Sequence, residues 1–234
     1  MNQRQPRKTG VALLVFAVVV SLLLADCSDT TTGPGKDPGG NNPTDTSAAI
    51  RFFPNSRNSV WFYELYDSLG DSVIDTLNIT IRGEQGLATN VFARVRETYH
   101  RIAETTDSTY VRVAGDSVQF YGSDRQALGH DLFLMPLTAD KRWENPGVFS
   151  SDSGGVQTID SVSVPAGEFP VSARVLNGWE QDFTTSGNLV TSWVVDSIGI
   201  IQQQHLSKVV FAGDTTIFEN TVWRLIGSNL IQSQ

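Results

Sequence analysis

The stretch Val73-Ile74-Asp75-Thr76-Leu77-Asn78-Ile79-Thr80-Ile81 decides the fold class of this chain. Positions 73, 77, 79 and 81 are apolar, and positions 76, 78 and 80 are polar. This period of two predicts a strand with one buried face. The stretch Val91–Arg96 alternates in the same way, and its pattern predicts that Arg94 and Arg96 lie on the outer face of the sheet.

Glycine-containing pairs separate the strand-like runs around this stretch. Glycine at the first central position suits the type II′ turn of a hairpin. A fifth hairpin is predicted at Val164–Phe169, where Pro165 presets the backbone for a type I turn and Gly167 can take the left-handed position after it. Most strands should therefore pair with their neighbours in sequence. The four glycine pairs are Gly70-Asp71, Gly115-Asp116, Gly187-Asn188 and Gly213-Asp214.

The predicted fold class is all-β. Strand signals fill residues 59–227, and helix is expected only in short pieces, around 123–128 and 138–143. This argues against parallel βαβ units. We expect an antiparallel meander of about a dozen strands that forms a half-barrel, a barrel or a two-layer sandwich. The sequence does not choose among these three.

Residues 1–26 have the charge and length of a signal peptide. Residues 1–10 carry three positive charges, and the 15 residues Val11–Ala25 are apolar except for Ser21. A helix of that length spans roughly 22 Å, short of the ~30 Å hydrocarbon core of a bilayer. A cleaved export signal is therefore favoured over a permanent transmembrane anchor.

Cys27 is the single cysteine of the chain, and it follows the apolar segment directly. The tetrapeptide Leu24-Ala25-Asp26-Cys27 resembles the bacterial lipobox, in which the cysteine receives a diacylglycerol and becomes the new N-terminus. Asp26 departs from that pattern, because a small residue normally precedes the cysteine. We predict lipid attachment at Cys27. The alternative is cleavage after Ala25, which leaves a free thiol in a secreted protein.

The expected domain order is a signal at 1–26, a lipid-anchored flexible linker at 27–48 and a single β domain at 49–234. Residues 28–48 lack large apolar side chains and cannot offset their ordering entropy by burial. As a flexible coil they would hold the domain about 25 Å from its anchor. Ser28 lacks the aspartate that retains enteric lipoproteins in the inner membrane, so we expect an outer-membrane lipoprotein of the cell envelope.

The charge of the chain argues against nucleic-acid binding. Without residues 1–26, it has 14 basic and 24 acidic side chains, and the longest basic run is Lys141-Arg142. A surface of this sign repels phosphate backbones. The expected partners are a membrane, reached through the N-terminal lipid, and a lipid or another envelope protein. No cofactor is predicted.

Four short blocks resemble a loose family of small bacterial lipoproteins without assigned function. That family is similar to the curved antiparallel sheets of the LolA- and LolB-type lipoprotein carriers. The resemblance implies a concave sheet face that holds an acyl chain. The blocks are Phe53-Pro54 leading to Asn58–Glu64, Leu134–Leu137 leading to Trp143, Val164–Phe169, and Trp193 leading to Ile198–Ile201.

Several residues are of types that can carry catalysis or bind metal ions. Ser151–Gly155 resembles the nucleophile segment of chymotrypsin-like proteases, but a glycine-rich solvent loop explains it better. His100, His130 and His205 are expected as isolated surface residues and not as metal ligands. The aspartates at 67, 71 and 75 are interpreted as turn and edge-strand residues. The tryptophans at 61, 143, 179, 193 and 223 are expected mainly as core bulk.

Three functions follow in order of preference. The first is a non-catalytic envelope lipoprotein whose curved sheet accepts an apolar ligand or lipid. The second is a protein-interaction or structural module of the envelope. The third is a hydrolase with a site that the sequence conceals.

Overall fold

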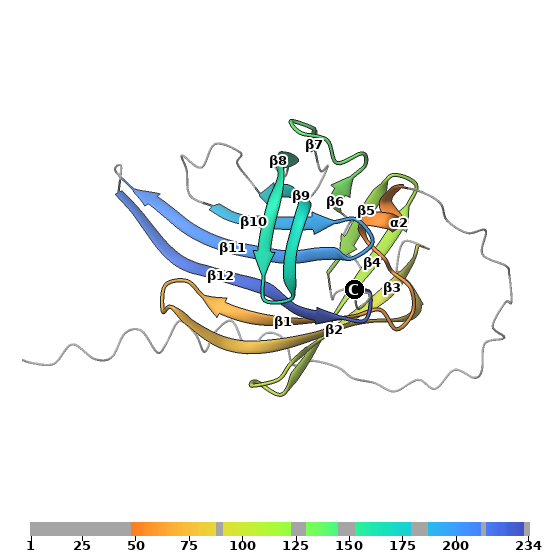
Figure 1. Ribbon diagram of the computed structural model, residues 1–234, viewed down its shortest axis with the longest axis horizontal. Coiled ribbons are helices and arrows are strands. Elements are labelled where there is room, and N and C mark those ends of the chain that lie inside the picture. The colour runs from red at the N-terminus through yellow and green to blue at the C-terminus, as the bar shows by residue number, and fades with distance from the viewer. Residues whose placement is uncertain are drawn as a thin grey trace, which may run out of the picture. The chain divides into compact units, whose positions relative to one another are not determined.

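The computed structural model describes residues 48–87, 91–122, 130–144, 153–178, 187–211 and 214–231. They form one short helix and twelve strands (Figure 1). The elements are α2 (Ala48–Phe52), β1 (Val60–Asp67), β2 (Ser72–Gly86), β3 (Phe92–His100), β4 (Thr105–Ala114), β5 (Ser117–Tyr121), β6 (His130–Leu134), β7 (Arg142–Glu144), β8 (Ser153–Val164), β9 (Gly167–Gly178), β10 (Gly187–Val195), β11 (Gly199–Phe211) and β12 (Asp214–Ser228).

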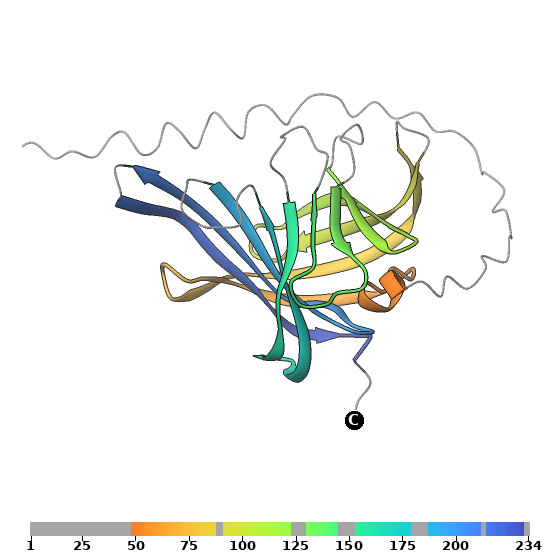
Figure 2. The ribbon, with the colours of Figure 1, turned by 90° about the horizontal axis from the view of Figure 1, so that it is seen from above.

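All twelve strands belong to one antiparallel sheet in the order β6-β5-β4-β3-β2-β1-β12-β11-β10-β9-β8-β7. The all-β prediction is confirmed, and the sheet curls on itself into a nearly closed barrel instead of splitting into two layers (Figure 2). A side-chain hydrogen bond among the described residues joins the edge strand β6 to β9, near the other edge of the sheet. Asn177 on β9 donates to the carbonyl of Leu132 on β6 at 3.2 Å.

Antiparallel strands place successive turns at alternate ends of the barrel. We name these ends by what they carry. The α2 end holds the chain before β1, the turn between β10 and β11, and the chain after β12. The open end holds the turns between β1 and β2, between β3 and β4, and between β11 and β12.

Apolar packing seals the α2 end. Trp61 is 3% exposed and donates from Nε1 to the carbonyl of Ile198 at 2.7 Å. The hydroxyl of Tyr63 donates to the carbonyl of Ile200 at 2.6 Å. Phe53, directly after α2, packs against Trp61 with ring centroids 6.1 Å apart. These contacts close this end around a core whose largest fully buried side chains include Phe133, Leu77, Ile79, Ile81, Ile201 and Leu225.

Three of the predicted turns are confirmed in position, although the β1–β2 loop spans residues 68–71 and its left-handed residue is Asp71, not Gly70. Asp71 ends the β1–β2 turn with a φ of 50°, and Gly115 opens the β4–β5 turn with a φ of 56°. Val164 pairs with Gly167, which has a φ of 142°, so Pro165 and Ala166 form the β8–β9 turn as expected. A left-handed φ is cheap for glycine because it has no Cβ.

Two of the predicted turns are displaced. Gly187 and Asn188 lie within β10, where they pair with Lys208 and Ser207, so the prediction of a turn there is wrong. Asp214 pairs with Phe211 and therefore already belongs to β12. Gly213 lies outside the described residues.

The helix predictions are wrong where they can be compared. Residues 138–141 form a turn that leads into β7, and all of 123–128 lies outside the described residues. The helix that does form, α2, covers five residues that carried no helix signal. Among the described residues, no helix has both the length and the apolar character that a membrane crossing requires.

Candidate functional site

Arg96 lies on the inner face of the sheet. It pairs directly with Ile81 on β2 and with Thr109 on β4, and directly paired residues share a face. Because Ile81 is fully buried in the core, the outward orientation predicted for Arg94 and Arg96 is wrong. Their apolar neighbours occupy the opposite face, where Ala93 and Val95 form a small separate cluster with Leu87, Tyr110 and Tyr121.

Aromatic rings from distant strands surround the Arg96 guanidinium. Its carbon lies 5.6 Å from the ring centroid of Phe120 on β5 and 5.9 Å from that of Trp223 on β12. Both distances are in the range of cation–π attraction. A cavity of about 10 Å³, enough for about one water molecule, adjoins it on the core side. Its lining is Phe53, Trp61, Tyr63, Ile79, Arg96 and Ile200.

Among the described side chains, no carboxylate is paired with the positive charge of Arg96. Burial lowers its pKa from the ordinary value, and Tyr63 acts in the opposite direction. Arginine nevertheless stays charged in proteins. Within the six described ranges, no carboxylate lies within ion-pair distance of Arg96. Four other arginines have such partners: Arg51 with Asp196, Arg82 with Glu97, Arg94 with Glu84, and Arg224 with Glu64.

Thr109 adds a second unsatisfied group beside this charge. Its Oγ1 is buried and has no hydrogen-bond partner among the described residues. Because Thr109 is the direct cross-strand partner of Arg96, both side chains leave the sheet on the same face. Buried polar atoms are nearly always hydrogen-bonded, so an exception marks a place where a partner is missing.

His205 extends the polar part of the inner face. Its ring stacks on Trp223 with centroids 5.3 Å apart, and Nε2 lies 3.2 Å from Oε1 of Gln203. Gln203 in turn donates from Nε2 to the hydroxyl of Ser192 at 2.9 Å. This network assigns the histidine proton to Nε2. Burial lowers the pKa of His205, Glu219 raises it and Arg96 lowers it further, so the ring is neutral at pH 7.

Stability is expected to fall between pH 7.5 and 5.5 because of His205. Its pKa is lower in the folded chain than the ordinary unfolded value of about 6.5, so the unfolded chain binds the proton first. The contribution of His205 to the free energy of unfolding is therefore complete above about pH 6.5. Below that pH it is lost, by less than about 1.4 kcal/mol per pH unit. Urea unfolding of wild type and His205→Gln at both pH values should show a smaller loss in the variant. Equal losses would contradict this assignment.

His100 is not the isolated surface residue that the sequence predicted, because it contacts two aspartates. Nδ1 of His100 lies 3.3 Å from Asp75, and Nε2 lies 3.1 Å from Asp107. Asp75 is 6% exposed and accepts hydrogen bonds from the backbone of Ile102 at 2.8 Å and of Thr76 at 2.7 Å. Burial raises the pKa of Asp75. The two backbone hydrogen bonds and His100 together lower it by more than burial raises it, so the net shift is downward.

This cluster ties β2, β3 and β4 together and does not form a metal centre. β2 is an interior strand, so the interpretation of Asp75 as an edge-strand residue is wrong. In the part of the chain that the structure describes, no three histidine, cysteine or acidic side chains are arranged to hold a metal ion.

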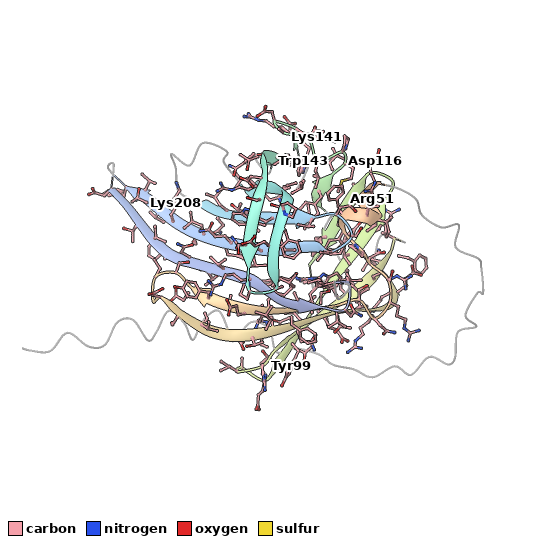
Figure 3. All side chains as sticks on the ribbon, in the orientation of Figure 1. Arg51, Tyr99, Asp116, Lys141, Trp143 and Lys208 are labelled. Carbon is pink, nitrogen blue, oxygen red and sulfur yellow. The ribbon has the colours of Figure 1, made fainter. Side chains whose placement is uncertain are left out.

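The protease-like segment is a strand where the structure describes it. Ser153 pairs with Glu144 on β7 and with Gly178 on β9, so neither an exposed nucleophile loop nor a solvent loop is present at Ser153. Gly154 lies directly under the indole of Trp143, which Figure 3 labels. A Cβ at position 154 would lie 2.2 Å from that ring. The glycine is therefore explained by packing. Ser151, Asp152 and the side chain of His130 lie outside the described residues.

The tryptophans divide between the core and the site. Trp61 and Trp143 are buried in the core, as predicted. Trp193 and Trp223 are only partly buried against it. Trp193 lies under Arg174 at 5.3 Å on the opposite face of the sheet, so Trp223 is the partly buried tryptophan of the inner face. Trp179 lies outside the described residues, as do residues 1–47, which include the predicted signal peptide, Cys27 and nearly all of the predicted linker.

Comparison with known proteins gives two distant similarities. No protein-family model matches the chain, and no curated protein matches its sequence. A solved structure from Bacteroides fragilis, described as an exported protein with a YmcC-like fold, has a TM-score of 0.48 and 12% identity. One from Parabacteroides distasonis, described as a lipoprotein, has a TM-score of 0.46 and 10% identity. Each similarity covers 76% of this chain and 98% of the other. At this distance neither assigns a family or a function, and the resemblance to LolA- and LolB-type carriers stays a prediction.

Proposed function

We propose that this chain is an exported, lipid-anchored envelope protein whose curved sheet binds a ligand with a large apolar part. The observation that supports this is the group of partly buried rings on the inner face, beyond the filled core. Phe120, Trp223 and His205 lie there around one charged group, Arg96. Apolar and aromatic walls with a few polar groups are typical of small-molecule sites.

The proposed location rests on the sequence. A signal at residues 1–26 directs export, and Cys27 carries the lipid that holds the domain at the outer membrane. The linker that follows leaves the domain free to meet a ligand away from its anchor.

We propose binding and not catalysis because no described group is arranged as a nucleophile with its base. Ser153 is a strand residue that pairs on both sides. His100 is engaged by Asp75 and Asp107, and His205 by Gln203. These histidines stabilise the sheet and the inner face.

Quenching of tryptophan fluorescence tests the proposal on the purified full-length chain. A fatty acid brominated along its chain quenches a tryptophan that it contacts. We expect saturable quenching that Trp223→Phe removes and that Trp193→Phe, on the opposite sheet face, retains. Lipid extraction and mass spectrometry of the same preparation should recover a bound apolar molecule.

Two results would contradict the proposal. One is the absence of both quenching and extractable lipid, which would favour the alternative of a protein-interaction module. The other is quenching that survives Trp223→Phe but disappears in Trp193→Phe, since the ligand would then lie on the outer face.

A further inference from the structure

We infer that the ligand of the inner face carries an anionic group, a carboxylate or a phosphate, which Arg96 and Thr109 bind. The inference rests on the proposed function and specifies the chemistry of the ligand. It is carried by the position of a guanidinium between Phe120 and Trp223 and by the unpartnered hydroxyl directly across the strand pair.

The first argument is the contrast between two arginines that both lie against aromatic rings. Arg224 follows Trp223 in β12 and therefore points to the outer face, where it lies 4.4 Å from the ring of Tyr66. Its Nη2 also contacts a carboxylate oxygen of Glu64 at 2.6 Å. Among the described side chains, Arg96 has the rings without a carboxylate. Of these side chains, Arg174 likewise lies over a ring, that of Trp193, without an ion pair, but it is on the outer face. Arg96 is partly buried on the inner face, so its N–H donors are available to an anion from outside.

The second argument is the fit between these groups and an oxyanion. A guanidinium presents a planar fork of N–H donors that matches the two oxygens of a carboxylate or two oxygens of a phosphate. The Oγ1 of Thr109 can donate one more hydrogen bond to the same group. Both side chains come from paired positions of β3 and β4 and are held on one face by the ladder.

The other charged groups of the inner face leave this positive charge uncompensated. Asp75 and Asp107 are both engaged by His100. Glu219 on β12 raises the pKa of His205 and accepts a hydrogen bond from Thr221 at 3.1 Å, and among the described side chains it forms no ion pair with Arg96. Arg94, on the same face as Arg96, is paired with Glu84. Arg96 therefore offers an anion a cationic group with aromatic walls on which the apolar part of the ligand can pack.

The test compares three probes with the same alkyl chain: dodecanoate, dodecyl phosphate and dodecanol. Binding to the full-length chain is measured by isothermal titration calorimetry below the critical micelle concentrations. We expect at least one of the two anions to bind about tenfold or more tightly than the alcohol, because charge-assisted hydrogen bonds are lost with the neutral head group. Preference between the two anions separates a fatty-acid source from a phosphorylated one.

Variants then assign the preference to the site. Arg96→Gln should weaken the preferred anion by about tenfold or more and leave the alcohol unchanged. Arg224→Gln, the matched control on the outer face, should leave all three affinities unchanged. Thr109→Val, which keeps the shape and removes the hydroxyl, should weaken the anion and not the alcohol.

The outcomes separate this inference from the proposed function. If the alcohol binds as tightly as both anions, the inference of an anionic head group is wrong, and the proposed apolar site is still supported. If none of the probes binds, the proposed function fails and the inference fails with it. Arg96→Met gives an independent readout: removal of an unpaired charge should raise the urea midpoint, whereas a lower midpoint would show that Arg96 is structural and overturn the inference.

Discussion

Replacing Trp61 by alanine is expected to lower the free energy of unfolding by about 3–5 kcal/mol. The indole is 3% exposed, packs against Phe53 and bonds the carbonyl of Ile198. Its removal opens a cavity in the core and leaves that carbonyl without its donor. These contacts join β1, the segment after α2 and the β10–β11 turn. Removing the indole therefore weakens the packing of the whole α2 end.

Phe62→Ala is the matched control for this prediction. Phe62 is the next residue in β1, points to the opposite face and is 40% exposed. Its replacement should cost about 1 kcal/mol or less. Urea unfolding followed by circular dichroism measures both variants, and similar losses would show that the filled core does not lie on the Trp61 face.

Gly154→Ala is expected to destabilise the fold by about 3 kcal/mol, at the upper end of overpacking effects. The new Cβ would lie 2.2 Å from the ring of Trp143, which is 7% exposed and belongs to the buried core. The indole must leave the core or β7 must separate from β8. Either movement opens the edge of the sheet that carries β7.

Two variants isolate this cause. Gly83→Ala, also in a strand, places its Cβ where no heavy atom lies within 4 Å, so it should change stability by about 0.5 kcal/mol or less. In a Trp143→Ala background the added cost of Gly154→Ala should nearly vanish. If the stability losses of Trp143→Ala and Gly154→Ala simply add in the double variant, the ring is not the reason for the glycine.

Local patterns were sufficient to predict the strands and most hairpins. The alternation in residues 73–81 and the turn chemistry at Gly115 and Gly167 depend on neighbours in sequence, and both are confirmed. The displaced turn at Gly187 shows the limit of this reasoning, because cross-strand pairing with Lys208 extends β10 through a residue pair that suits a turn.

The candidate site depends on packing that no local pattern contains. Alternation around Arg96 shows that it opposes Val95, but not which of the two faces the core. That choice depends on Ile81, Phe120 and Trp223, which lie in three other strands.

The interpretation of Gly154 and Gly155 as part of a solvent loop is wrong for a related reason. A serine followed by two glycines matches a catalytic segment by residue type alone. The actual constraint on Gly154 is the ring of Trp143, eleven positions earlier, which becomes visible only when β7 and β8 pair.

The pairing of β1 with β12 in the middle of the sheet bears on the order in which the sheet can assemble. Trp61 pairs with Ser228 and Asp67 with Thr221, partners that lie more than 150 residues apart in the sequence. Pairing over such a separation requires a long loop to be closed, so we expect this seam to form late in folding. Until it forms, the strands make two smaller sheets, β1–β6 and β7–β12, whose edges β1 and β12 are open to pairing with other chains.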